Sequence, residues 1–173
     1  MTDNPSGRAH ALGSLRSADG KGIVRIEDRF DTDIDDLWCA LADPERLARW
    51  LGRFEGDLRV GGGFRARFFA SEWEGTGHVE VCDPPRHLLV RTTESGATGQ
   101  DVIEIRLSAA GEQTVLVVEQ RGLPRDQLAA YAAGLQIHVE DLAAYLVGRE
   151  RCDGPARWKE LVPHYQAKRI EET

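Results

Sequence analysis

The chain has few of the residues that build metal, redox and nucleophile sites. Its 173 residues include only three cysteines, Cys39, Cys82 and Cys152, which are far apart and odd in number. This count predicts reduced thiols rather than a disulfide framework, and it favours a cytoplasmic location. No Cys-x-x-Cys pair or His-Glu-x-x-His motif occurs, and the five histidines show no metal-ligand spacing. We therefore expect neither a metal site nor a cofactor.

The sequence also lacks long apolar runs and an excess of basic residues. No apolar stretch approaches the roughly 20 residues of a membrane span, and residues 1–22 have no apolar core of a secretory signal. The net charge of −7 argues against a nucleic-acid partner, because phosphate binding requires a basic face. Gly-rich dinucleotide motifs, phosphate loops and the Gly-x-Ser-x-Gly elbow are absent as well.

The composition is that of one ordinary globular domain, with 41% hydrophobic and 29% charged residues. Residues 1–22 are rich in glycine, serine and polar residues, and we expect them to form a loose tail. Residues 23–148 carry the folded domain. Residues 149–173 form a C-terminal extension with a short helix, and we expect its charged last residues to fray.

The most regular pattern predicts a long helix over residues 124–147. Gly122 and Pro124 mark its entry, and Gly148 lies where a left-handed C-cap is expected. Large side chains recur at three- and four-residue steps and form one broad stripe. The stripe comprises Leu128, Tyr131, Leu135, His138, Val139, Leu142, Tyr145 and Leu146. Such a stripe requires a partner surface.

The residues upstream predict that surface. Residues 23–30 alternate as a first strand, and Asp33 and Asp43 then stand as N-caps of two short helices. Alternating runs separated by turn signals follow up to residue 120. We expect an α+β fold, in which a curved antiparallel sheet of about 6–7 strands wraps on the long C-terminal helix.

A curved sheet and a straight helix leave space between them, and this space is the first place to look for a ligand site. The residues predicted to face it are the candidate ligand-binding set. They are Phe64, Phe68, Val79, Val81, Leu88, Val90, Thr92, Ile105, Leu116, Val118, Gln120, Tyr131, Leu135, His138 and Leu142.

Each polar member of this set has two interpretations. His138 is either a polar anchor or general acid/base at the cavity wall, or a core histidine bonded to a neighbour. Thr92 and Gln120 either orient a ligand or meet water at strand ends, and Tyr131 either lies at the cavity mouth or packs. Trp73, in a polar turn, is either a lid over the opening or a contact with another chain.

Three segments resemble a known bacterial family. They are residues 43–50 (DPERLARW), 57–62 (DLRVGG) and 77–88 (GHVEVCDPPRHL), in the expected order. On these motifs the chain is identified as a member of the activator-of-Hsp-ninety-ATPase-like branch of the START, polyketide-cyclase and birch-pollen-allergen superfamily. The resemblance implies a helix-grip fold with a cavity between the sheet and the last helix. Family members bind lipids, polyketides and other apolar molecules.

The chain departs from the family at two positions. The family often has tryptophan where this chain has Thr92 and Leu135. Both residues are smaller than tryptophan, so we expect an open and roomy cavity.

Three functional hypotheses remain. The first is binding of a small apolar or amphipathic molecule, with no catalytic residues. The second is an enzyme of cyclase, dehydratase or hydrolase type in the same cavity, which requires a titrating residue near a second polar group. The third is a stress- or chaperone-related interaction module that uses Trp73 and the C-terminal extension. That extension either packs back on the domain or joins a homodimer.

Overall fold

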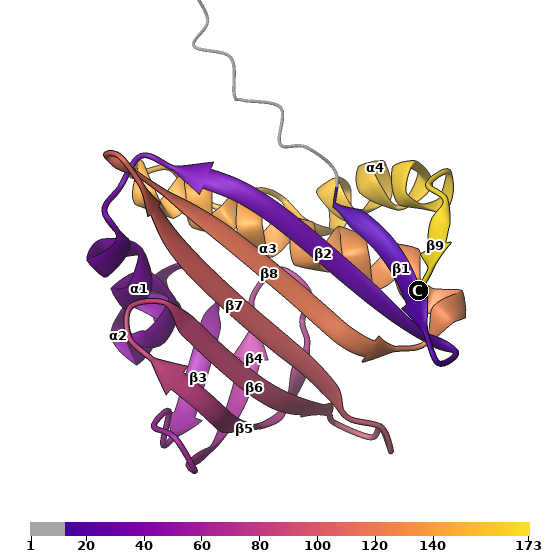
Figure 1. The fold of residues 1–173 in the computed structure, drawn as a ribbon, viewed down its shortest axis with the longest axis horizontal. Coiled ribbons are helices and arrows are strands. Elements are labelled where there is room, and N and C mark those ends of the chain that lie inside the picture. Colours follow the sequence, from indigo (N-terminus) through magenta and orange to yellow (C-terminus); the bar gives the residue numbers. More distant parts are fainter. Residues whose placement is uncertain (1–12) are drawn as a thin grey trace, which may run out of the picture.

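The structure is a computed structural model that describes residues 13–173, and residues 1–12 lie outside the described part. A curved sheet of nine strands wraps around the long helix α3 (Leu128–Leu146), which crosses its concave face (Figure 1). The strand order is β3-β4-β5-β6-β7-β8-β2-β1-β9. The predicted α+β fold is confirmed, with more strands than the 6–7 that we expected.

Strands β3 to β8 form an antiparallel meander, and β2 lies beside β8 at its end. All neighbouring strands are antiparallel except β1 and β9, which are parallel. Their bounds are β2 (Lys21–Phe30), β3 (Gly52–Gly56), β4 (Gly63–Phe68), β5 (Glu74–Asp83), β6 (His87–Glu94), β7 (Asp101–Ala110) and β8 (Gln113–Leu123). The two remaining strands are β1 (Ser14–Ala18) and β9 (Ile170–Glu172).

Strands β1 and β9 correct our expectations for the two ends of the chain. The predicted loose tail is wrong from Ser14 onward, because β1 pairs with β2 through a two-residue turn. Asp19 and Gly20 in that turn both have positive φ, 50° and 75°, as a type I′ hairpin requires. The predicted fraying of the last residues is also wrong, because β9 pairs in parallel with β1. The expectation for residues 1–12 falls outside the described residues.

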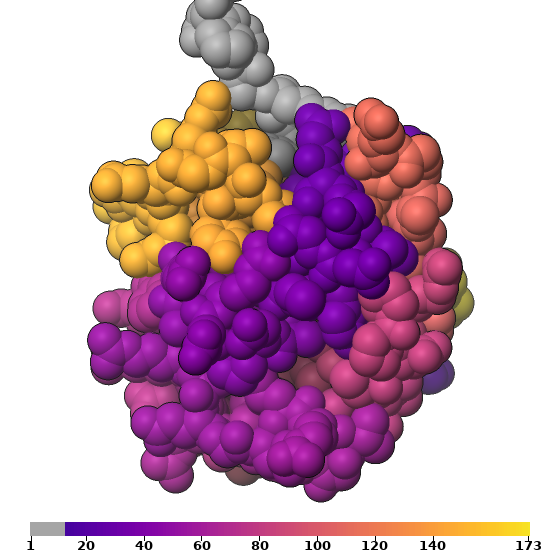
Figure 2. Space-filling view, turned by 90° about the vertical axis from the view of Figure 1, so that its left-hand side faces the viewer, coloured from indigo at the N-terminus to yellow at the C-terminus, as the bar shows by residue number. Residues whose placement is uncertain are grey.

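The two short helices follow β2 as predicted and close one end of the concave side (Figure 1). They are α1 (Ile34–Ala42) and α2 (Pro44–Trp50). Asp33 caps α1 by accepting from the backbone N–H of Asp36 at 2.8 Å, and Asp43 caps α2 in the same way. The indole N–H of Trp50 donates to the carbonyl of Ala40 at 2.9 Å and so joins the two helices. Both helices form the middle of the face in Figure 2.

Helix α3 begins after a short 3₁₀ turn, η1 (Arg125–Gln127), so it starts later than predicted. Gly148 has a φ of 72° and supplies the predicted left-handed cap. Near this end, Arg46 of α2 donates to the Tyr145 hydroxyl at 3.0 Å and to the Asp36 carboxylate at 2.7 Å. This contact ties the short helices to the long one. Within the described residues, no helix is both long and apolar enough to span a membrane.

The C-terminal extension packs back on the domain through helix α4 (Gly154–Gln166), which lies along α3. Its Tyr165 is fully buried. The Tyr165 hydroxyl accepts from the backbone N–H of Gly13 at 2.8 Å and donates to Gln136 Oε1 at 2.5 Å. One side chain thus joins α4, α3 and the start of β1.

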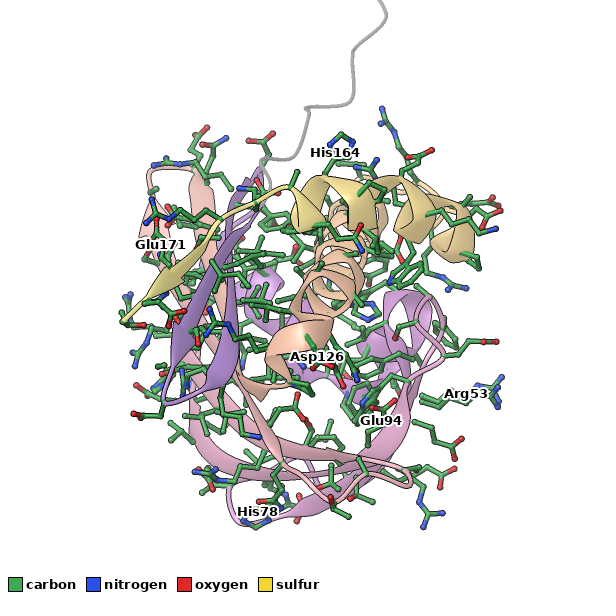
Figure 3. The ribbon with its side chains drawn as sticks, turned by 90° about the vertical axis from the view of Figure 1, so that its right-hand side faces the viewer. Arg53, His78, Glu94, Asp126, His164 and Glu171 are labelled. Atoms are coloured by element: carbon green, nitrogen blue, oxygen red, sulfur yellow. The ribbon has the colours of Figure 1, made fainter. Side chains whose placement is uncertain are left out.

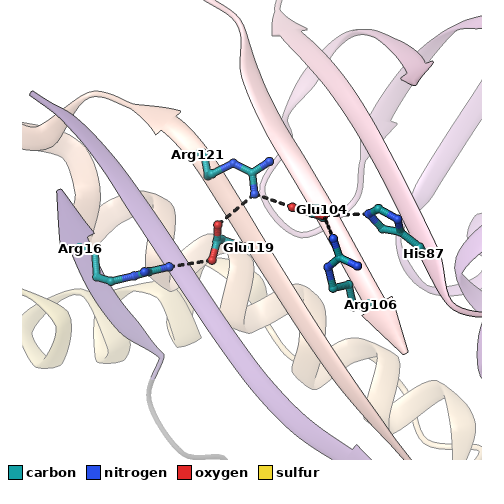
Figure 4. A network of polar contacts seen from close by, with 6 residues as sticks. All are labelled: Arg16, His87, Glu104, Arg106, Glu119 and Arg121. Carbon is teal, nitrogen blue, oxygen red and sulfur yellow. Dashed lines mark hydrogen bonds and ion pairs between the residues drawn. The ribbon is translucent and has the colours of Figure 1, made fainter. Parts of the chain in front are cut away.

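The convex face of the sheet carries charges instead of an apolar surface (Figure 4). Glu104 accepts from His87 and Arg106 at 2.7 Å each and from Arg121 at 2.6 Å. Arg121 also bonds Glu119, which pairs with Arg16 on β1. Because side chains alternate along a strand, Glu104 faces outward while its neighbours Ile103 and Ile105 face the concave side. The ligand site must therefore be sought on the concave side.

Candidate ligand-binding site

Two adjoining chambers lie between the concave face of the sheet and α3. The inner chamber has a volume of about 140 Å³, and the outer chamber has a volume of about 560 Å³. A shared set of side chains forms the neck where they meet: Phe68, Thr92, Ile103, Leu135 and His138. The two positions where the family often has tryptophan, Thr92 and Leu135, are both in this neck.

The inner chamber is lined almost entirely by hydrocarbon and aromatic side chains. Strands β4 to β8 supply one wall, and α3 supplies Leu135, Val139 and Leu142 opposite. Helix α2 and strand β3 close the far end. The remaining lining residues are Leu41, Ala42, Leu47, Trp50, Leu51, Phe54, Leu58, Phe64, Val79, Cys82, Leu88, Val90, Ile105, Leu116 and Val118. The polar side chains Thr92 and His138 of its lining both lie at the neck.

A β-bulge in β5 makes one predicted lining residue wrong. The register shifts between Val79 and Val81, so that Val79 pairs with Val90, Val81 with Leu89 and Cys82 with Leu88. Residues directly opposite one another in a sheet lie on the same face. Cys82 therefore joins Leu88 in the chamber wall, and Val81 lies on the convex side with Leu89. Simple alternation from Val79 to Val81 fails at the bulge.

Glycines on β5 make room for the aromatic rings beside the neck. A Cβ atom at Gly77 would lie 2.1 Å from the Phe64 ring, and one at Gly75 would lie 2.6 Å from the Trp73 ring. Trp73 in turn packs on Phe68, with ring centroids 4.8 Å apart. The rings can lie against the strand only because these two positions lack side chains.

A carboxylate that the sequence did not reveal organises the polar side of the neck. Asp101, the first residue of β7, accepts from the Thr92 hydroxyl at 2.9 Å and from the Gln120 amide at 2.5 Å. It thereby holds two predicted polar residues from β6 and β8 in fixed orientations. Asp101 itself lines the outer chamber together with Gln120.

His138 lies in the neck with one satisfied and one unsatisfied ring nitrogen. Its Nε2 is 3.2 Å from the Ser71 hydroxyl, and its ring meets Phe68 edge-on at 5.1 Å. Its Nδ1 is buried and has no hydrogen-bond partner among the described residues. Burial lowers the pKa of His138 to about 4, so the ring is neutral at pH 7. The free nitrogen leaves hydrogen-bonding capacity at the entrance to the inner chamber.

The outer chamber has a mixed polar and aromatic lining that draws on α3, α4 and the turn between β4 and β5. Tyr131 lies here, and Trp73 is half-buried in the wall instead of projecting freely. Burial raises the pKa of Tyr131, and the carboxylates of Glu94 and Asp101 raise it further. Trp158 and Lys159 complete the wall from α4. The extension therefore contributes to the site.

Most of the predicted residues line the two chambers, although their contact with a ligand stays a prediction. Eight of the predicted residues line the inner chamber alone, and four more line both chambers at the neck. Gln120, Tyr131 and Trp73 line the outer chamber alone, and Val81 lines neither. The α2–β3 wall, Ser71, Glu94, Asp101 and the α4 residues were missed. Among the described residues, no cluster of metal-ligating side chains occurs.

Comparison with known proteins identifies the family. Residues 31–147 match the family model described as Activator of Hsp90 ATPase homolog 1-like protein. This match spans more than half of the chain, so the chain belongs to that family, as the motifs predicted. Helix α4 lies beyond the matched residues. No curated protein matches the sequence significantly.

Several solved structures share the fold. CalU16 from Micromonospora echinospora is 25% identical, with 90% of this chain and 94% of that chain covered and a TM-score of 0.75. DynU16, a protein in the dynemicin biosynthetic locus, is 28% identical over 76% of this chain and 50% of its own, with a TM-score of 0.69. The BPP1335 protein from Bordetella parapertussis, 22% identical over 98% and 92% with a TM-score of 0.71, supports the fold alone.

Proposed function

We propose that this member of the Activator of Hsp90 ATPase homolog 1-like family binds a small amphipathic molecule in the two chambers. The observation that carries the proposal is an apolar inner chamber joined to a polar outer chamber through a neck of a few side chains. Burial of apolar ligand surface contributes about 25 cal/mol per Å² and supplies most of the affinity. That DynU16 comes from a biosynthetic locus supports a small molecule as the ligand.

The size of the inner chamber defines the apolar end of the ligand. Its volume of about 140 Å³ is close to that of an engineered apolar cavity, about 150 Å³, that admits a benzene ring. The outer chamber, at about 560 Å³, lies within the range of small-molecule sites. The ligand therefore carries a ring-sized apolar end and a larger, more polar remainder.

The neck supplies orientation. Nδ1 of His138 is buried and has no hydrogen-bond partner among the described residues, so a rotation of the ring that turns this nitrogen toward the chamber lets it pair with a hydroxyl or amide of the ligand. Thr92 and Gln120 are already fixed by Asp101 and present a rigid polar edge opposite. Such preorganisation lowers the entropy that binding must overcome.

Calorimetric titration with 4-phenylbutan-1-ol tests the proposal. The variant Leu135→Trp places in the neck the residue that relatives often carry, and we expect it to weaken binding at least about tenfold by closing the inner chamber. The matched control is Val147→Trp, at the C-cap of α3, where the side chain is 65% exposed. Equal affinity in the wild type and Leu135→Trp would contradict the proposal.

An enzymatic function is the second candidate, because His138 has a lowered pKa and lies 3.2 Å from the Ser71 hydroxyl. A serine activated by histidine also needs a group that orients the second ring nitrogen, and Nδ1 has none among the described residues. A pKa of about 4 further makes His138 a weak base at neutral pH. We expect the hydrolysis of p-nitrophenyl butyrate to be the same in wild type and Ser71→Ala, and a loss in the variant would favour the enzyme.

A further inference from the structure

The outer chamber carries an excess of negative charge. Its acidic side chains are Glu72, Glu94 and Asp101, and its one lysine or arginine is Lys159. His138 adds no positive charge, because it is neutral at pH 7. A ligand group that enters this chamber therefore meets a net negative field, and in a space partly screened from water that field acts more strongly than at the surface.

Two of these carboxylates act on the same point in the chamber. The carboxylates of Glu94 and Asp101 both raise the pKa of the Tyr131 hydroxyl, so both act on this side chain. Figure 3 shows Glu94 on the same side of the molecule as Asp126, which precedes α3, and Glu94 lines the outer chamber. Each oxygen of Asp101 accepts one protein donor, from Thr92 and from Gln120. A carboxylate offers about four acceptor sites, so Asp101 keeps capacity for a ligand.

Aromatic rings from three different elements surround the same space. Trp73 comes from the β4–β5 turn, Tyr131 from α3 and Trp158 from α4. The indole N–H of Trp158 donates to the carbonyl of Ala130 at 3.3 Å, which holds its ring over α3. Aromatic faces attract ammonium groups and do not attract carboxylates. The rings thus favour the same sign of charge as Glu94 and Asp101.

An independent observation indicates that the chambers are built for a ligand. Nδ1 of His138 is buried at the neck without a partner, although buried polar atoms in proteins are nearly always paired. The residue lines both chambers, so a molecule that spans them passes the His138 ring.

We propose that the ligand is an amphipathic cation, with a ring-sized apolar body in the inner chamber and a protonated amine between Glu94 and Asp101 in the outer chamber. This inference rests on the proposed binding function and adds the charge of the ligand to it. Helix α4, which lies beyond the residues matched by the family, supplies Trp158 to the amine site.

Three probes of matched shape test the inference by calorimetric titration at low salt: 4-phenylbutylamine, 4-phenylbutan-1-ol and 4-phenylbutanoate. We expect the amine to bind about tenfold or more tightly than the carboxylate, with the alcohol between them. Glu94→Gln is expected to reduce the ratio of amine to alcohol affinity by about threefold to tenfold. Glu112→Gln is the matched control, since it removes the same charge from an exposed turn outside both chambers.

The salt dependence of the wild type provides a second readout that requires no variant. Raising the ionic strength from about 0.01 M to 1 M shortens the screening length from about 30 Å to 3 Å and is expected to erase much of the preference for the amine. Equal binding of all three probes, or tighter binding of the carboxylate, would overturn the inference and leave the proposed function standing. Binding of none of the probes would overturn both.

Discussion

His138 is the polar side chain of α3 that lines both chambers. The ring is neutral, lies between the two chambers and presents an unpaired nitrogen. The sequence left two interpretations open, a polar anchor and a core histidine bonded to a neighbour. The contact with Ser71 agrees with a core histidine bonded to a neighbour. The unpaired Nδ1 is consistent with a polar anchor for a ligand.

The lowered pKa of His138 predicts a defined pH dependence of stability. The unfolded chain takes up this proton near pH 6.5 and the native protein only near pH 4, so the unfolded state binds more protons between these values. The free energy of unfolding therefore falls as the pH is lowered from 6.5 to 4, by up to about 1.4 kcal/mol per pH unit from this residue.

Urea denaturation of wild type and His138→Phe across this pH range measures the effect. The difference in slope between the two is the contribution of His138, and we expect the variant to have the shallower slope. His164→Gln, at an exposed histidine on α4, is the control for loss of a histidine outside the chambers. Parallel slopes for wild type and His138→Phe would show that the native histidine titrates normally.

At the scale of single elements, the bulge in β5 decides which side chains reach the inner chamber. Cys82 lies in the wall and Val81 on the convex side, against the simple alternation that predicted the reverse. Cys82→Phe is expected to fill the inner chamber and weaken binding of 4-phenylbutan-1-ol about tenfold. Val81→Phe is expected to bind as the wild type does. Weakened binding in Val81→Phe alone would restore the alternating register.

Helix α4 is attached to the domain in part through one buried hydroxyl, that of Tyr165. Tyr165→Phe leaves the backbone N–H of Gly13 and the Gln136 carbonyl without their partner in a buried place. An unsatisfied buried polar group costs about 1–3 kcal/mol, and we expect a loss of this size in chemical denaturation. A change below about 0.5 kcal/mol, as expected for an exposed site such as His164, would mean that water replaces the hydroxyl.

The elements that the sequence predicted are those with strong local signals. Asp33 and Asp43 as caps, the stripe on α3 and Gly148 as its C-cap all depend on residues within a few positions of one another. Strand β9 depends instead on pairing with the distant strand β1, where Leu15 lies beside Ile170. A local sequence pattern does not identify a partner so distant in the chain. Strand β1, by contrast, could have been predicted, because Asp19-Gly20 is a signal for the hairpin that joins it to β2.

The part of the candidate site that the sequence predicted is likewise the part with a local signal. Apolar positions such as Leu88, Val90 and Ile105 follow from alternation. Asp101 and Glu94 stand at strand ends, where alternation gives no direction, and their importance appears only when β6, β7 and β8 lie side by side. The wall formed by α2 and β3 depends on how these elements pack against the sheet, and the periodicity of the sequence does not predict that packing.

In the whole molecule, the sheet and α3 enclose two adjoining chambers whose linings differ in polarity. In the proposed function, the inner chamber selects an apolar ring, the neck orients it, and the outer chamber, to which α4 contributes, meets the polar end. The charged network of the convex face lies on the other side of the sheet (Figure 4).

Native mass spectrometry of the freshly purified chain, with solvent extraction of any molecule that co-purifies with it, measures directly whether the two chambers bind a small molecule. The account predicts a discrete additional mass of drug-like size, present in wild type and Val147→Trp and absent from Leu135→Trp. The extracted molecule should contain a ring system and a basic nitrogen. An apo mass in every sample, together with no thermal shift from the amine or alcohol probe, would contradict the account.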